Sequence, residues 1–596
     1  MKRFFGLSVG TLGYALAQFA QGRTPRTDVA PASAGAVPRQ TIIVLPSSAA
    51  GESLYSDLEF LLRGRTVGEL GPIQLARFFQ WDVLPFDALS PSAEISAARM
   101  FALHTLLSPQ ASVVLTTPEA LCQRILSRAR FTKAPFELTV GASLSREHLV
   151  GALDSLGYVR ASVVEELAQF AVRGAVVDFF PPGSDYPLRV ELFGDVVESI
   201  RKFDAETQRS NPSAQLPRRD VGSVVVLPVS EVLFPGVDSN ATLESGALPG
   251  REEWPRLLTA LRERGVETGV PIRVLDSLQD VVEQGGTWPG MEHLQPLFGG
   301  ELGSLWDYVS SDAQIIVCDE TAVESAFDRM RDLLDEQSRR AHDEQRLVPP
   351  IETSYFDPDL ALDDLRTRAK ISFDQLNLIA FEDSEFRTGS AAEEDERVRI
   401  ESASRIMLGD FARLAQKLKH SRQEELPFQP LADAMNKELE DSQRVILLMS
   451  HLPRAKRMRE LLAPYGIECE EFDGSLAEWE VLEDERRHTR TRESRKVVHI
   501  LHGFLNGSVR SLDERLSILV DHEIFPEISK RKPSRSTSSI RRFLGSTSQM
   551  KEDDFVVHID HGVAIYRGLR KLVVEGKEGD FLTLEYAEGA KLFIPV

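Results

Sequence analysis

The sequence predicts a multidomain protein of the α/β class that ends in a small β-barrel. Its length, 596 residues, corresponds to about three to five domains of ordinary size. Short apolar runs alternate with amphipathic helical patterns, as at 41–45 followed by 54–62, and this succession is typical of α/β units. After residue 554 the pattern changes to short strands separated by glycine turns, which is typical of a small, Tudor-like barrel.

Composition describes a globular protein kept in a reducing compartment. Hydrophobic residues make up 42% and charged residues 27%, so large cores can be buried. The formal net charge of −22 argues against tight, sequence-independent DNA binding by the chain as a whole, because such binding relies on cations that replace the counterions of phosphates. The three cysteines, Cys122, Cys318 and Cys469, are far apart and predict neither disulfides nor a metal site. We expect a cytoplasmic protein.

The first twenty residues have the outline of a secretory signal, because Lys2 and Arg3 precede a mostly apolar segment. Polar and glycine residues interrupt that segment at Ser8, Gly10, Thr11 and Gly13. No other run approaches the roughly 20 apolar residues that are needed to span a bilayer. We therefore expect no membrane association.

The segment Gly6 to Gly13, GLSVGTLG, is a glycine-containing stretch that can be compared with a phosphate-binding loop. A working loop has the pattern GxxxxGK[ST], in which backbone N–H groups and the lysine hold the phosphates. The segment has no lysine, and the only Gly-Lys pair of the chain, at Gly576, precedes a glutamate. We expect no ATPase site and no bound cofactor in this chain.

The run IIVCDE at 315–320 imitates a Walker B element, in which carboxylates hold Mg²⁺. Many buried parallel strands end in an acidic residue. Without the lysine of the phosphate loop, Asp319 and Glu320 have no triphosphate to act on. The sequence favours a retained α/β scaffold over a nucleotide-binding domain.

Residues 170–204 predict a β-meander with strands at 175–180 and 188–193. In the second strand Leu188, Val190 and Leu192 alternate with Arg189, Glu191 and Phe193. An aromatic and an arginine thus share the polar face. The plain interpretation is an exposed strand, and the alternative is a protein-binding surface, since these residue types are frequent interface anchors.

This stretch resembles the domain shared by the excision-repair protein UvrB and the transcription-repair coupling factor Mfd, which docks the damage-recognition protein UvrA. The resemblance rests on Arg173-Gly174, the turn 182–184, the strand 189–195 and the segment 198–201. It implies that Arg173, Arg189 and Phe193 contact UvrA. The Trp-acidic, Leu-Pro-aromatic-Asp element at 81–91 is similar to the same family, whose helicase-type α/β domain is degenerate in Mfd.

Two further regions resemble the coupling factor. Strands at 444–449, 497–501 and 516–520 with a helix at 453–462 predict a small α/β domain whose ending, His-Glu-Ile-Phe at 522–525, is similar to the third domain of Mfd. The C-terminal strands resemble the RNA-polymerase-interacting domain shared by Mfd and the regulator CarD. That resemblance implies edge pairing with the polymerase β subunit through Lys571, Leu572 and Val573.

The expected domain boundaries follow from these segments. They are a UvrB-like degenerate α/β domain at 1–135 and 229–385, an inserted α+β UvrA-binding domain at 136–228, an acidic or helical linker at 386–430, a small α/β domain at 431–527, a Ser/Arg-rich linker at 528–550 and a CarD-like domain at 551–596.

The resemblance implies a monomeric factor of transcription-coupled excision repair that holds UvrA and RNA polymerase and meets DNA only through the complex. In the family a translocase motor that uses ATP and Mg²⁺ follows the polymerase-interacting domain, and no motor motifs precede Val596. The expectation is an adaptor, either a fragment or a motorless form. The alternatives are part of an ATP-driven DNA translocase and a CarD-like transcription regulator.

Overall fold

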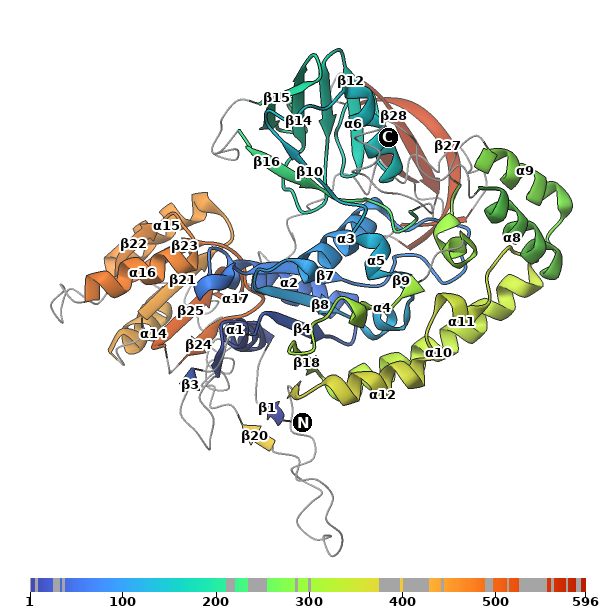
Figure 1. Ribbon diagram of the computed structural model, residues 1–596. Helices are drawn as coiled ribbons and strands as arrows, with labels where there is room; N and C mark the ends of the chain where they lie inside the picture. Colours follow the sequence, from blue (N-terminus) through green and yellow to red (C-terminus); the bar gives the residue numbers. More distant parts are fainter. Residues whose placement is uncertain are drawn as a thin grey trace, which may run out of the picture. The chain divides into compact units, whose positions relative to one another are not determined.

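The computed structural model is a mixed α/β protein, as expected (Figure 1). It describes residues 2–5, 9–24, 33–34, 38–210, 220–233, 254–283, 288–298, 302–374, 397–399, 428–440, 444–487, 497–511, 514–524, 555–558, 562–574, 577–585 and 591–595. The chain divides into two compact units, Met1–Pro526 and Glu527–Val596. In the part of the chain that the structure describes, no helix is long and apolar enough to cross a membrane.

A seven-stranded sheet organises the first unit, with all neighbouring strands parallel. Its strand order is β20 (Arg397–Arg399), β1 (Lys2–Phe5), β19 (Ile371–Asp374), β18 (Gln314–Cys318), β4 (Gln40–Val44), β8 (Ser112–Thr116) and β7 (Gln74–Phe78). Strands β4 and β8 are buried along their whole length, as parallel strands covered on both faces must be.

The two faces of this sheet belong to two different cores. In β4, Ile42 and Val44 enter one hydrophobic core while Ile43 enters the other, because successive side chains of a strand point to opposite faces. The first core takes buried residues from helices α3 (Ala93–Leu107), α4 (Pro118–Cys122), α10 (Glu320–Asp343) and α12 (Pro358–Arg368). The second takes them from α1 (Val9–Ala20) and α2 (Ser48–Leu62). Short helices α5 (Arg128–Phe131) and α11 (Ile351–Ser354) contribute Phe131 and Ile351 to the side of the first core.

The N-terminal apolar segment is part of the sheet and its cover. Strand β1 pairs with β19 and β20, and Phe4 stacks on Phe373 at 5.2 Å between ring centroids. Leu16 of α1 is fully buried in the second core. The apolar character that resembles a secretory signal is therefore explained by packing inside this α/β domain.

The inserted region folds around a five-stranded sheet, β11 (Val159–Arg160), β12 (Gln169–Arg173), β13 (Val176–Phe179), β14 (Leu188–Phe193) and β15 (Val196–Lys202). The meander β12 to β15 is antiparallel, in agreement with the sequence. A two-stranded sheet, β10 (Phe136–Thr139) with β16 (Ser223–Val226), joins the ends of the insertion. Helix α6 (Arg146–Ser155) supplies Leu149, Ala152 and Leu153 to the same core as the inward face of the sheet.

A small parallel sheet with one antiparallel edge strand forms the third α/β region. Its order is β22 (Glu468–Phe472), β23 (Val497–His502), β21 (Arg444–Met449), β25 (Leu516–Val520) and β24 (Val509–Ser511). Helices α14 (Gln429–Glu440), α15 (Leu452–Leu462), α16 (Leu476–Arg487) and α17 (Asp521–Ile524) accompany it. The sequence does not predict β22, α16 and β24. The charged run from 468 to 487 hides the periodicity of β22 and α16, and β24 has only three residues.

The third α/β region packs on the first without a break in the apolar core. Ile446, Leu448 and Trp479 belong to the same buried cluster as α1 and α2. At the end of α2, Arg65 forms a two-bonded ion pair with Glu480 at 2.5 and 2.7 Å. The two α/β regions therefore share one core inside the first unit.

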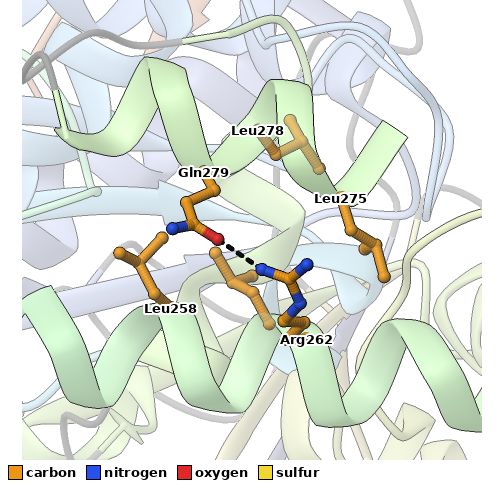
Figure 2. Close-up of a pocket in the computed structure, with 6 residues that line it drawn as sticks. Leu258, Arg262, Leu275, Leu278 and Gln279 are labelled. Carbon is orange, nitrogen blue, oxygen red and sulfur yellow. Dashed lines mark hydrogen bonds between the residues drawn. The ribbon is translucent and has the colours of Figure 1, made fainter. Parts of the chain in front are cut away.

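Two helices, α8 (Trp254–Glu267) and α9 (Ile272–Glu283), form a hairpin in the second half of the α/β domain. Leucines of both helices and a hydrogen bond from Arg262 to Gln279 close the hollow between them (Figure 2). The 3₁₀ segment η2 (Met291–Phe298) follows the hairpin along the chain.

Short elements complete the first unit. They are the strand pairs β2 (Arg23–Thr24) with β3 (Ser33–Ala34), β5 (Thr66–Val67) with β6 (Gly71–Pro72) and β9 (Ile125–Leu126) with β17 (Leu302–Gly303), and the 3₁₀ turns η1 (Gly68–Leu70), η3 (Leu305–Asp307) and η5 (Ala463–Tyr465). Of the expected acidic linker, β20 pairs with β1, and the run Glu393 to Glu396 lies outside the described residues. The Ser/Arg-rich linker also lies outside them.

The second unit contains a four-stranded antiparallel sheet, β26 (Phe555–His558), β27 (Gly562–Val574), β28 (Lys577–Glu585) and β29 (Lys591–Pro595). Each strand pairs with the next along the chain. The register shifts between Tyr566 and Leu569 of β27, and Gly568 within this bulge has φ +83°, a conformation that favours glycine. The four strands agree with those expected from the sequence, while closure into a barrel stays a prediction.

Candidate protein-docking surfaces

Two tight turns define one end of the five-stranded sheet. Residues Gly174 and Ala175 connect β12 to β13, and Gly194 and Asp195 connect β14 to β15. Gly174 and Gly194 have φ of +61° and +60°, as two-residue hairpin loops require. The turns place Arg173 and Phe193, the last residues of β12 and β14, at the same end of the sheet.

The strand register puts the three expected docking residues on one face. Arg173 pairs with Val176, Val176 pairs with Glu191, and Glu191 lies between Arg189 and Phe193 on alternate positions of β14. Residues paired across strands share a face. The opposite face of β14, with Leu188, Val190 and Leu192, is buried in the core, as the alternation predicts. We call the face with Arg173, Arg189 and Phe193 the meander face.

Phe193 is the most exposed large apolar side chain of the described residues, with 79% of its surface accessible. Its cross-strand partner Val196 is 44% exposed, so the two form an apolar spot at the β14–β15 turn. Arg173 is exposed, and among the described residues no ion pair or hydrogen bond holds its side chain. An exposed ring and an exposed cation on one face are the residue types of an interface anchor.

Arg189 differs from the other two, because the fold holds it on several sides. Its Nε and Nη2 donate to the two carboxylate oxygens of Asp178 at 2.8 and 2.9 Å, and Asp178 lies opposite it on β13. Its Nη1 donates to the carbonyl of Gln208 at 3.3 Å, and the guanidinium carbon lies 4.5 Å from the centre of the Phe203 ring. The hydrogen bonds to Asp178 raise the pKa of Arg189 above its usual value.

The structure changes the predicted effect of removing Arg189 on the stability of the domain. The sequence predicts that a substitution of this arginine leaves stability nearly unchanged. Asp178 is only 2% exposed, so loss of Arg189 would leave a buried carboxylate without its partner. Arg189 is therefore part of the domain's structure as well as of the meander face.

Arg201 and Glu191, two further charged residues of the meander face, pair with each other. On β15, Arg201 forms an ion pair with Glu191, and Ser199 donates to the same carboxylate at 3.1 Å. On the described part of strands β12 to β15, this leaves Arg173 as the cation of the face without a carboxylate partner.

A residue that sequence reasoning missed fixes the β12–β13 turn. Arg146, at the start of α6, donates to the carbonyl of Gly174 at 2.9 Å and also binds Glu147. The helix begins here because Ser145 caps it by accepting from the N–H of His148. No local pattern of the sequence relates Arg146 to a turn 28 residues away.

Strand β27 provides the second candidate surface. Residues 565–574 pair with β28 on one side, whereas β26 covers only residues 562–565 on the other. Within the described residues, the segment that contains Lys571, Leu572 and Val573 thus has one edge without a paired strand. An open strand edge offers main-chain N–H and C=O groups to a partner strand.

The Walker B-like ending of β18 has a structural explanation. Asp319 is the N-cap of α10, and its carboxylate accepts from the N–H of Ala322 at 3.2 Å. It adopts φ +61°, and its own N–H donates to Phe373. The acidic end of β18 therefore starts a helix. Of the segment Gly6 to Gly13, residues 6–8 lie outside the described residues, and α1 begins at Val9.

Two hollows among the described residues are small. The hollow between α8 and α9 and a second hollow beside Trp81, His293 and Tyr355 each hold about 10 Å³, room for one water molecule. Burial lowers the pKa of His293 to about 4. Throughout the described ranges, no group of three or more His, Cys, Asp or Glu residues could hold a metal ion.

Comparison with protein families gives two matches. The model described as "UvrB interaction domain" matches residues 136–221, and the model described as "CarD-like/TRCF RID domain" matches residues 550–596. The first match contains the whole meander, and the second contains the four strands β26 to β29.

Curated relatives are named transcription-repair-coupling factors. The Myxococcus xanthus protein is 28% identical over 94% of this chain, and the Escherichia coli (strain K12) protein is 26% identical over 87%. The Haemophilus influenzae protein is 26% identical over 93%. The matches cover 43%, 39% and 42% of these relatives, so the chain spans less than half of their length. By sequence the chain is thus similar to transcription-repair-coupling factors over most of its length, and it contains one region that matches the UvrB interaction domain and one that matches the CarD-like/TRCF RID domain.

Proposed function

We propose that this chain serves transcription-coupled nucleotide excision repair as an adaptor that holds UvrA on the meander face and RNA polymerase on β27. The observation that carries the proposal is the exposure of Phe193 and Arg173 at the turns of a domain that matches the UvrB interaction family. The names of the relatives and the second family match support the pairing of a repair partner with a transcription partner.

The meander face suits a protein partner of moderate affinity. Phe193 offers a large apolar group at low cost in side-chain entropy, and the cation of Arg173 lies on the same face. The rigid sheet beneath them is already formed, so binding requires little ordering. In this proposal Phe193 fills an apolar pocket of UvrA, and Arg173 and Arg189 supply polar contacts around it.

The β27 edge suits recognition by strand addition. Main-chain hydrogen bonds from Lys571, Leu572 and Val573 would extend a sheet of the polymerase β subunit, and alternate side chains would supply specificity. Because the two surfaces belong to separate units, both partners can be held by one chain.

The proposal assigns no nucleotide chemistry to these 596 residues. Asp319 caps a helix, and the Gly6 to Gly13 segment lacks the lysine of a phosphate loop. ATP-driven translocation on DNA is the alternative activity, carried by residues outside this sequence, and a CarD-like regulatory role is another. DNA would be reached through the complex, and the proposed form is a cytoplasmic monomer.

A binding assay with purified UvrA tests the first surface. We expect Phe193→Ala to weaken binding by about 2 kcal/mol, roughly thirtyfold, because a central aromatic anchor is lost. Leu360→Ala, which removes a 70% exposed side chain on α12, is the matched control and should bind as the parent does. Normal UvrA affinity in Phe193→Ala would place the contact elsewhere.

Co-purification with RNA polymerase tests the second surface. We expect Leu572→Arg to lose polymerase and keep UvrA, because a charged group in a strand-pairing contact would be desolvated without a partner. Val266→Arg, at a 69% exposed position on α8, serves as the control for the added charge. Unchanged capture by Leu572→Arg would refute the β27 contact, and capture by neither parent nor variant would refute polymerase binding by this chain.

A further inference from the structure

We propose that Asp178 is a positioning residue of the meander face, which holds the Arg189 guanidinium so that its remaining N–H groups meet acceptors of the partner. The inference rests on the proposed function, since it takes UvrA as the partner. It concerns a buried carboxylate that the sequence pattern of the docking residues does not include.

The number of N–H donors on the Arg189 guanidinium supports this positioning role. A guanidinium has five N–H donors in one plane. In the structure Nε and Nη2 each give one to Asp178, and Nη1 gives one to Gln208. One N–H on each Nη nitrogen is left. Among the described residues no hydrogen-bond acceptor takes these two donors, and the side chain keeps 19% of its surface exposed.

The surroundings fix the plane of the guanidinium. Asp178 grips one edge with two nearly equal hydrogen bonds, which define a direction as well as a distance. The Phe203 ring, fully buried, lies 4.5 Å from the guanidinium carbon. Gln208 is itself held, because its Nε2 donates to the carbonyls of Val164 and Ala205. Arg189 therefore has little side-chain freedom left to lose on binding.

The pairing also separates the roles of the two arginines. Asp178 neutralises the charge of Arg189, so its contact with a partner depends on geometry and only weakly on ionic strength. Arg173 has no such carboxylate among the described residues and keeps a full charge on the same face. The salt dependence of docking should therefore reside in Arg173, and the geometric requirement in Arg189.

The test measures UvrA affinity of the full chain at low and at physiological salt. Asp178→Asn keeps the size of the side chain and removes the charge. We expect its affinity to fall about tenfold, because the guanidinium is no longer fixed, and its salt dependence to become steeper, because the charge of Arg189 is released. Arg173→Gln should show a shallower salt dependence than the parent.

Two variants separate positioning from general effects of charge or stability. Glu191→Gln removes the nearer of the two carboxylates beside Arg201, leaving Asp220 at 4.0 Å, and changes the net charge equally, so it should steepen the salt dependence without the tenfold loss. Arg189→Lys keeps the charge but cannot form the two-bonded pair, and it should lose affinity as Asp178→Asn does. If Asp178→Asn does not fold, the UvrA affinity of Arg189→Lys still tests the positioning role of the pair.

The outcomes are distinguishable. Parental affinity in Asp178→Asn or Arg189→Lys overturns the proposal, as does a tenfold loss in Glu191→Gln. If Asp178→Asn folds and loses UvrA affinity but keeps the parent's salt dependence, Asp178 has a purely structural role. This result also overturns the proposal. Phe193→Ala tests the meander face itself. Normal UvrA binding by Phe193→Ala would refute the proposed docking site. If Phe193→Ala loses UvrA binding while Asp178→Asn and Arg189→Lys keep it, only the positioning role of Asp178 is refuted.

Discussion

Replacement of Asp57 by asparagine should make the first unit more stable at neutral and alkaline pH. Asp57 lies on α2, is 2% exposed, and accepts hydrogen bonds from the backbone N–H and the Nδ2 of Asn506 at 2.7 and 2.9 Å. Asn506 also donates to the carbonyl of Ser53 at 2.8 Å. These bonds join the first α/β region to the loop after β23.

Burial raises the pKa of Asp57 from 3.8 to about 7, although the hydrogen bonds from Asn506 act in the opposite direction. A carboxyl with a raised pKa binds its proton more tightly in the folded state than in the unfolded state. The Asp57 carboxyl contributes fully to the stability of the folded state below about pH 4. This contribution is lost as the pH rises through about 7. At 1.36 kcal/mol per pKa unit, the full loss is about 4 kcal/mol, of which about 2 kcal/mol falls between about pH 5 and pH 7 and about 3 kcal/mol between about pH 5 and pH 8.

Chemical denaturation of the parent and of Asp57→Asn at about pH 5 and pH 8 measures this effect. The asparagine can accept both hydrogen bonds and does not titrate, so its advantage over the parent should grow by about 3 kcal/mol between the two pH values. Glu59→Gln, an exposed change on the same helix, is the control for loss of one charge and should follow the parent. Parallel pH profiles of parent and Asp57→Asn would refute the reasoning.

Two further predictions concern stability. Arg189→Ala should lower the free energy of unfolding by about 3 kcal/mol, because Asp178 stays buried without its ion-pair partner, whereas Phe193→Ala should change it by less than about 0.5 kcal/mol; equal melting temperatures of the two variants would contradict this. Asp319→Ala should cost about 1 kcal/mol by removing the N-cap of α10, and Asp319→Asn should keep most of that stability, as urea denaturation can measure; an unaffected Asp319→Ala would show that the cap contributes nothing.

The sequence was sufficient wherever a feature depends on neighbouring residues. Alternation along β14 identified which side chains face inward, and Leu188, Val190 and Leu192 are indeed buried. The turn glycines set the limits of the meander, and apolar runs located β21 and β25 at 444–449 and 516–520. These patterns are local, because strand periodicity and turn preference depend on only a few consecutive residues.

Only the tertiary structure decided how candidate residues are held. Arg189 and Phe193 look alike as anchors in the sequence, yet one is bound to Asp178 and the other is exposed. Asp319 imitates a magnesium ligand and proves to cap a helix. In each case the type of residue allows both roles, and the neighbours brought by the fold select one.

The contact between Asp57 and Asn506 is the clearest example of what no sequence pattern contains. The two residues are 449 positions apart; Asp57 lies in a predicted helix, and Asn506 lies in the loop after β23. Their pairing depends on how two sheets share one core, which fixes the burial of Asp57 and with it the pKa near 7. Periodicity determined the elements of this protein, whereas burial and long-range pairing, which arise only when the elements pack, determined the chemistry of their side chains.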